Sequence, residues 1–118
     1  MPSTPSRSIA ERLQDILDNI RLAFEFVRDL SFEDFQRDQR TLYAVVRCLE
    51  IISEASRYLP ADLKQRHQNI PWTDIAGAGN IYRHQYQGVQ DQLIWRAIQN
   101  RLEPLRVVIE KELERFKE

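Results

Sequence analysis

Apolar residues recur at every third or fourth position along almost the whole chain. This spacing places them on one side of an α-helix, whereas a half-buried β-strand would need strict alternation of apolar and polar residues. The helical period runs through three long segments, at 9–30, 42–59 and 89–116, and the sequence contains no alternating strand pattern. The chain is therefore predicted to be all-α.

Capping signals and prolines mark where the helices begin and end. Ser8 followed by Glu11 has the pattern of a capping box, and Ser31 with Asp34 repeats it. Pro60 is expected to end the second long segment, because proline disfavours helical geometry in the residue before it.

Pro104 lies inside the last apolar segment and is expected to kink it or split it in two. With short connections between the segments, we predict an antiparallel up-and-down helical bundle of four to five helices. One domain would span residues 8–118, after a flexible N-terminal tail at residues 1–7, since a chain of 118 residues suffices for a single core. The long apolar stripe of the last segment favours a homodimer.

The charged residues are numerous but nearly balanced. Seventeen Lys and Arg face 18 Asp and Glu, for a formal net charge of -1, so any contact with nucleic acid must be local. The single Cys48 lies in an apolar helical stripe, which favours a buried, inert thiol in a reducing, cytoplasmic setting. No segment has the ~20 consecutive apolar residues of a membrane span, so neither membrane insertion nor secretion is expected.

The stretch from Pro71 to Trp95 differs from the helical remainder. It holds all three glycines of the chain, both tryptophans and one of the two histidines. A glycine in a helix interior costs about 1 kcal/mol relative to alanine, so Gly77 and Gly79 indicate a purpose other than helix stability. Trp72 and Trp95 are expected to be core anchors.

Asn80 and His84 are four residues apart, which places them on one face of a helix, with Arg83 and Tyr86 to either side. An imidazole moves protons in both directions near neutral pH, and a guanidinium binds phosphate through two donors. Together these groups suit metal-independent cleavage of RNA. The ribose 2′-hydroxyl would attack the adjacent phosphate, the histidine would transfer protons, and the guanidinium would steady the developing charge.

Plainer interpretations stand beside this one. A histidine in a helix next to aromatic residues is more often a hydrogen-bonded structural residue, and spacing alone does not separate the two roles. His67 lies in a polar run and is expected to be solvated. The acidic residues show no metal-ligand spacing, and the sequence has no phosphate-binding glycine loop, so no metal or cofactor is expected.

Matches to one known family follow one another in order from about Ile9 to Leu113. They are Asp38, Thr41, the run 44–55, Ile70-Pro71-Trp72, Ile75-Ala76-Gly77, Asn80, His84, Tyr86, Val89, Ile94-Trp95, Leu102, Pro104 and Leu105. In this order the chain resembles the HepT-like branch of the HEPN superfamily. These are small helical proteins encoded beside an MntA-type minimal nucleotidyltransferase in bacterial and archaeal toxin–antitoxin pairs.

The resemblance implies a helical bundle that dimerises through its motif-bearing helices and forms a shared cleft. The family signature is an Arg, four intervening residues, a His, one residue and a Tyr. Arg and His carry metal-independent endoribonuclease activity, and the nucleotidyltransferase neutralises the toxin by transferring AMP to the Tyr. His84 and Tyr86 match this signature, whereas Gly79 stands where the arginine is expected.

Gly79 supplies no charge, and loss of one such stabilising group commonly lowers the rate by ~10² to 10³. Arg83, one residue before His84, and Arg47, on the preceding helix, are the candidates to replace it. The leading hypothesis is therefore a toxin of a type VII-like pair, an endoribonuclease that uses these residues and is neutralised by AMP transfer to Tyr86.

Two alternatives remain open at this point. The first is a nuclease-inactive HEPN module whose work is to dock a minimal nucleotidyltransferase, and Gly79 favours it. The second is a structural helical dimer without RNA chemistry.

Overall fold

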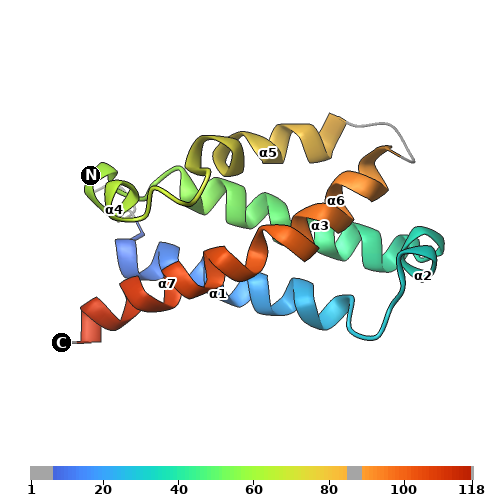
Figure 1. The fold of residues 1–118 in the computed structure, drawn as a ribbon, viewed down its shortest axis with the longest axis horizontal. Helices are drawn as coiled ribbons and strands as arrows, with labels where there is room; N and C mark the ends of the chain where they lie inside the picture. The colour runs from blue at the N-terminus through green and yellow to red at the C-terminus, as the bar shows by residue number, and fades with distance from the viewer. Residues whose placement is uncertain (1–6, 85–88, 118) are drawn as a thin grey trace, which may run out of the picture.

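The fold is all-α, as predicted. This computed structural model describes residues 7–84 and 89–117, of which 80–84, 89 and 90 are described in their backbone alone. No strand occurs in these ranges, which form seven helices (Figure 1): α1 (Ile9–Phe26), α2 (Phe32–Arg37), α3 (Gln39–Ser56), α4 (Ala61–Arg66), α5 (Trp72–His84), α6 (Val89–Asn100) and α7 (Leu102–Lys117).

The long helices form an up-and-down bundle. α1, α3 and α5 run alternately in opposite directions, and α6 followed by α7 returns along them (Figure 1). α1 packs against both α3 and α7, and α3 packs in turn against α5. The short helices α2 and α4 lie at opposite ends of the bundle (Figure 1). This arrangement confirms the predicted architecture, with five long helices in the described ranges and two short ones.

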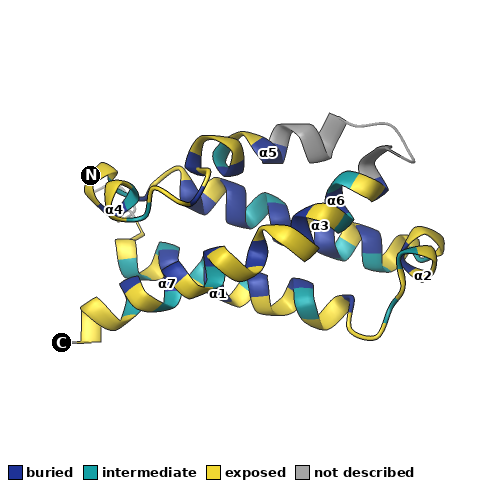
Figure 2. Ribbon diagram, in the orientation of Figure 1, coloured by how far each residue is buried: buried dark blue, intermediate teal, exposed yellow. Residues whose placement is uncertain are grey.

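The core lies where the helices face one another (Figure 2). Its largest apolar side chains with less than 2% exposure come from α1, α2, α3, α4, α6 and α7. They are Leu13, Ile16, Ile20, Phe35, Val45, Leu63, Ile94, Ile98, Leu105 and Ile109. Burying one side chain of this size stabilises the fold by about 1.5 to 3 kcal/mol relative to leaving it exposed. The apolar residues that recur at the helical period therefore form the surface that holds the bundle together.

The predicted capping boxes are present. The Ser8 hydroxyl accepts a hydrogen bond from the Glu11 amide at 3.1 Å, and the Glu11 carboxylate accepts one from the Ser8 amide at 3.1 Å. The second box caps α2 in the same way. α1 ends at Phe26, a few residues before the predicted position, and Asp29 has a positive φ of 64° in the turn that follows. Aspartate tolerates this left-handed conformation better than most residues other than glycine.

The last apolar segment is split rather than merely kinked. The break falls at Arg101, between α6 and α7, and Pro104 is the third residue of α7. Proline has no N–H for the carbonyl of Asn100, and its ring pushes against that carbonyl. The Arg101 amide still donates to the Ala97 carbonyl at 3.0 Å, so the helical hydrogen bonds of α6 continue up to the break. The bend presents Arg101 at the junction.

The predicted burial of the cysteine and the predicted packing of the two tryptophans on the core are confirmed. Cys48 is buried, and burial raises the pKa of its thiol, which keeps it protonated and unreactive. The indole of Trp72 donates to the His67 carbonyl at 2.9 Å. The ring of Trp95 lies 5.2 Å from that of Phe35 between centroids.

His67 is not solvated, so this prediction was wrong. Its side chain is 16% exposed, and its Nε2 lies 2.6 Å from Oε2 of Glu112, whose other oxygen accepts from Arg66 at 2.6 Å. Burial raises the pKa of Glu112, but the hydrogen bonds from Arg66 and His67 outweigh it and hold this pKa below its usual value. The cluster ties α4 to α7 across 45 residues of sequence, which a local pattern does not reveal.

Candidate functional site

Small residues set the distance between α5 and α3. The Ser53 hydroxyl on α3 donates to the Ala76 carbonyl at 2.9 Å, and the same hydroxyl accepts from the Gly79 amide at 3.2 Å. Arg57 adds a second bond to the Ala76 carbonyl, from Nε at 3.0 Å. Three side-chain-to-backbone bonds therefore hold the helix that carries the motif.

Gly79 is buried at this contact. A Cβ atom added to it would lie 3.0 Å from Oγ and 3.4 Å from Cβ of Ser53, which is closer than ordinary van der Waals contact. A larger side chain at position 79 would need Ser53 to shift. The departure from the family signature therefore coincides with a close approach of two helices.

Gly77, two residues earlier, is in the opposite situation. No heavy atom lies within 4 Å of a Cβ added there, so packing does not require a glycine. Position 77 lies about 200° around the helix axis from position 79 and is exposed. The two glycines of α5 thus face different surroundings, one against α3 and the other toward open space.

The predicted motif residues belong to the end of α5 and the connection that follows. Asn80, Arg83 and His84 lie in its last turns, where their side chains are outside what the structure describes. Tyr86 lies outside the described residues altogether. The helix does extend to position 84, so positions 80 and 84 share a side of its backbone, as the spacing predicted.

Arg47 is exposed on α3. It precedes Ser53 by six residues, which places it about 120° around the helix axis from the contact with α5. In the described part of the chain, the side chains that hydrogen-bond to the α5 backbone are those of Ser53 and Arg57, and Arg47 is not among them.

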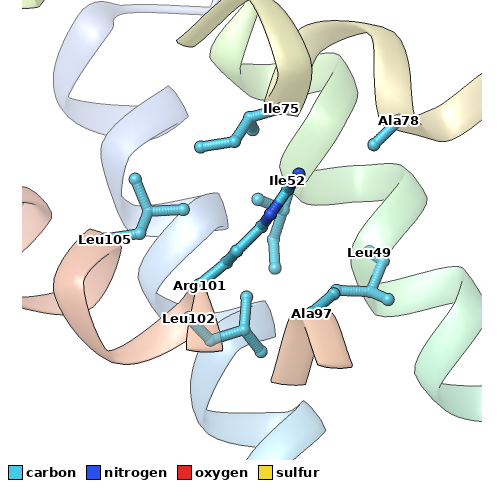
Figure 3. A pocket seen from close by; sticks show the side chains of 8 residues that line it. All are labelled: Leu49, Ile52, Ile75, Ala78, Ala97, Arg101, Leu102 and Leu105. Atoms are coloured by element: carbon cyan, nitrogen blue, oxygen red, sulfur yellow. The ribbon is translucent and has the colours of Figure 1, made fainter. Parts of the chain in front are cut away.

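A groove of about 610 Å³ lies between α5 and the junction of α6 with α7. The polar residues and the glycine that line it are Thr73, Asp74, Gly77, Arg96, Asn100 and Arg101. Arg101 also borders a small apolar pocket beneath the groove, together with Ile52, Ile75 and Ala78 (Figure 3). Its side chain extends from the junction toward α3 and α5, between Ile75 and Ala78 (Figure 3).

The two arginines of the groove have no ionic partner among residues 7–79 and 91–117. Other arginines of the bundle do have one. Arg106 donates to both Glu103 and Glu110, and Arg66 donates to Glu112. An unpaired guanidinium in a groove remains free to bind an anion.

Sequence reasoning did not single out these residues. Arg96 and Arg101 lie outside the signature, and the one local signal was Pro104, which places Arg101 at the bend. Asp91 was also missed. It is 8% exposed, and its Oδ1 has no hydrogen-bond partner in the described part of the chain. A buried polar atom without a partner is rare in folded proteins.

The described ranges contain neither a candidate metal site nor a candidate membrane span. There, no group of three or more His, Cys, Asp or Glu side chains is arranged to hold a metal ion. Among the same residues, none of the helices is both long enough and apolar enough to span a membrane.

Comparison with known proteins identifies the family to which the chain is similar. The family model described as "Ribonuclease HepT-like" matches residues 16–112, which include α5. A protein of Thermococcus cleftensis named "Probable ribonuclease HepT" is 40% identical over 105 residues, covering 89% of this chain and 96% of the relative.

Two further relatives also have names that contain RNase. A protein of Methanocaldococcus jannaschii named "Putative RNase" is 34% identical over 88% of this chain and 95% of its own. Another of that name, from Caldanaerobacter subterraneus subsp. tengcongensis, is 36% identical over 89% of this chain and 94% of its own. No solved structure matches the chain. The match over residues 16–112 and the near full-length relatives show that this chain belongs to the HepT-like family of the HEPN superfamily.

Proposed function

We propose that this chain is a metal-independent endoribonuclease, the toxin component of a type VII-like toxin–antitoxin pair. The observation that carries the proposal is the family match over residues 16–112, because the matched region includes the α5 helix and His84. Relatives named as ribonucleases, aligned over most of their length, support the same reaction class.

The reaction needs a group that transfers protons and a positive charge near the phosphate. The 2′-oxygen of a ribose forms a bond to the adjacent phosphorus, and the bond from phosphorus to the 5′-oxygen breaks. His84 takes the proton of the 2′-hydroxyl, and an imidazolium gives a proton to the leaving 5′-oxygen. Asn80 orients the reacting groups, and Arg83 or Arg47 steadies the charge that develops on the phosphate. The products are a 2′,3′-cyclic phosphate and a 5′-hydroxyl.

RNA cleavage by the purified protein and by His84→Ala tests this function. We expect the variant to be slower by at least ~10²-fold, since general acid–base catalysis by one side chain contributes about 10² to 10⁴. Equal helical circular dichroism in the two proteins would show that the loss is not one of folding. Equal cleavage rates would remove His84 from the mechanism.

Regulation is proposed to act through Tyr86. In a homodimer located in the cytoplasm, the partner would be an MntA-type minimal nucleotidyltransferase. The Tyr86 phenol oxygen would attack the α-phosphorus of ATP and release pyrophosphate, which leaves AMP on the tyrosine. The homodimer is proposed on the family resemblance. Four apolar side chains of α1 and α7 are exposed outside the core, namely Leu22, Phe26, Val107 and Phe116.

Mass spectrometry after co-expression with the nucleotidyltransferase tests the modification. We expect a mass increase of one AMP on the peptide that contains Tyr86, and none on the same peptide from Tyr86→Phe. An unmodified wild-type peptide in the presence of active partner and ATP would contradict this role.

A nuclease-inactive HEPN module that docks the nucleotidyltransferase is the second candidate. The close contact of Gly79 with Ser53 favours it, because no guanidinium can extend from that position. This candidate predicts no RNA cleavage and no growth defect when the chain is expressed alone. Toxicity that His84→Ala abolishes would exclude it.

A further inference from the structure

We propose that the groove between α5 and the α6–α7 junction binds the phosphodiester backbone of a single RNA strand through Arg96 and Arg101. This inference rests on the proposed ribonuclease function and gives its substrate a binding surface. The groove also supplies a local positive charge in a chain whose charges are nearly balanced. A chain with a formal net charge of -1 needs a local concentration of positive charge to hold RNA.

The spacing of residues along α5 places the groove and position 84 on the same side of the helix. Asp74 and Gly77 line the groove from α5, and position 84 follows Gly77 by seven residues. Seven residues are about two helical turns, so position 84 lies on the same side of the helix backbone as Gly77, roughly 10 Å farther along. A strand lying in the groove would therefore run along α5 toward the end of the helix that bears His84.

The charge of the groove suits a phosphate ligand. Arg96 and Arg101 are exposed and have no ionic partner within the ranges that the structure describes. Asp74 contributes one carboxylate, and Asn100 and Thr73 contribute neutral hydrogen-bonding groups. Two guanidiniums against one carboxylate leave an excess of positive charge, and a guanidinium can donate two parallel bonds to a phosphate.

The backbone of Arg101 is fixed before any ligand binds. Pro104 bends the chain at this residue, and the Arg101 carbonyl accepts from the Leu105 amide at 3.3 Å, which fixes its backbone. Its side chain crosses the small apolar pocket beside Ile52 and Ile75 (Figure 3). A guanidinium whose stem rests on apolar surface loses less conformational freedom on binding than a free one.

The apolar pocket that adjoins the groove is too small to accept a base. It holds only about 20 Å³, against about 610 Å³ for the groove itself. Proteins that bind single strands commonly track the backbone in a positively charged groove of this kind. The groove would therefore contact phosphates and leave the bases outward.

Binding of a short, fluorescently labelled 2′-O-methyl RNA tests the proposal, because this probe lacks the 2′-hydroxyl and is not cleaved. We expect Arg96→Gln and Arg101→Gln each to weaken binding by about tenfold, the scale of one charged hydrogen bond. Each should also lower the slope of log affinity against log salt by about 0.7. Arg28→Gln is the matched control, since it removes an exposed arginine of the α1–α2 turn that lies outside the groove.

A pair of opposite charges at Gly77 gives a second test that removes no arginine. The position has open space around it, so both Gly77→Lys and Gly77→Glu should fold. We expect the lysine variant to bind the probe more tightly than wild type and the glutamate variant to bind it more weakly. Equal affinities for the two variants would overturn the proposal.

These measurements separate the groove from the proposed reaction. Suppose that His84→Ala binds the probe normally but does not cleave RNA, and that the two arginine variants lose binding. This result would support both the RNA-binding groove and the ribonuclease activity. If the probe binds through the two arginines but wild type cleaves no RNA, the groove stands and the ribonuclease fails. The groove proposal is wrong if cleavage depends on His84 but the two arginine variants bind the probe as well as Arg28→Gln does. It is also wrong if AMP alone binds through the two arginines.

Discussion

The carboxylate of Glu112 is the most deeply buried charge in the described ranges, with a side chain that is 3% exposed. We expect Glu112→Gln to lower the free energy of unfolding by about 2 kcal/mol at neutral pH, because it removes the buried carboxylate that accepts from both Arg66 and His67. Of its described partners, Arg66 would keep only the exposed Asp62, in an ion pair. Urea unfolding followed by circular dichroism would measure it. Glu114→Gln is the control, since its carboxylate is 68% exposed and should change stability by less than about 0.5 kcal/mol.

The effect of Glu112 should depend on pH with a definite sign. The pKa of this group is held below its ordinary value of 4.5 in the folded chain. Its contribution is therefore complete above pH 4.5 and is lost as the pH falls through the lower, folded value. A difference between wild type and Glu112→Gln that grows on acidification would contradict this assignment.

At the level of single residues, the sequence predicted what depends on near neighbours. Ser8 with Glu11 forms its capping box because both partners lie within one turn. His67 was misjudged, because its partner Glu112 is 45 residues away and is brought close only when α7 packs near α4. A polar run therefore does not by itself mean a solvated histidine.

The contact of α5 with α3 gives the next prediction, at the level of helices. We expect Gly77→Ala to stabilise the protein by about 1 kcal/mol, because alanine favours helix and nothing obstructs its methyl group. Gly79→Ala gains the same helix propensity but brings its methyl group to 3.0 Å from Ser53 Oγ, so it should be less stabilising than Gly77→Ala, or destabilising. Thermal and urea unfolding of the two variants would show the difference.

A double-mutant cycle with Ser53→Ala isolates the contact. Ser53→Ala alone should destabilise by about 1 to 3 kcal/mol, because it leaves the buried polar groups that the hydroxyl bridges without their partner. In that background Gly79→Ala should become more favourable, since the crowded oxygen is gone. Additive effects, together with equal changes at Gly77 and Gly79, would show that the helices do not approach as closely as described.

Helix boundaries show where local sequence stops being informative. Pro104 predicted an interruption of the helix in the last segment. Whether that helix kinks or splits depends on how α6 and α7 pack on different neighbours. α6 contacts α2 and α3, whereas α7 contacts α1. The position of Arg101 in a groove beneath α5 follows from that packing and could not be read from the residues around it.

For the molecule as a whole, the all-α bundle could be predicted because its core follows the helical period of the chain. The buried residues Leu13, Ile16 and Ile20 of α1 repeat at intervals of three and four. The candidate site is different in kind. His84 and Tyr86 were predicted from their helical spacing and from the family signature. The surroundings of Gly79 and the groove with Arg96 and Arg101 arise from contacts between helices distant in sequence.

The chemistry of the RNA ends tests the central claim most directly. Wild-type protein, incubated with a single-stranded RNA in excess chelator, should yield products that end in a 2′,3′-cyclic phosphate and begin with a 5′-hydroxyl, and His84→Ala should yield none. Products with a 3′-hydroxyl and a 5′-phosphate, cleavage that stops when metal is removed, or the same products from His84→Ala would contradict the account.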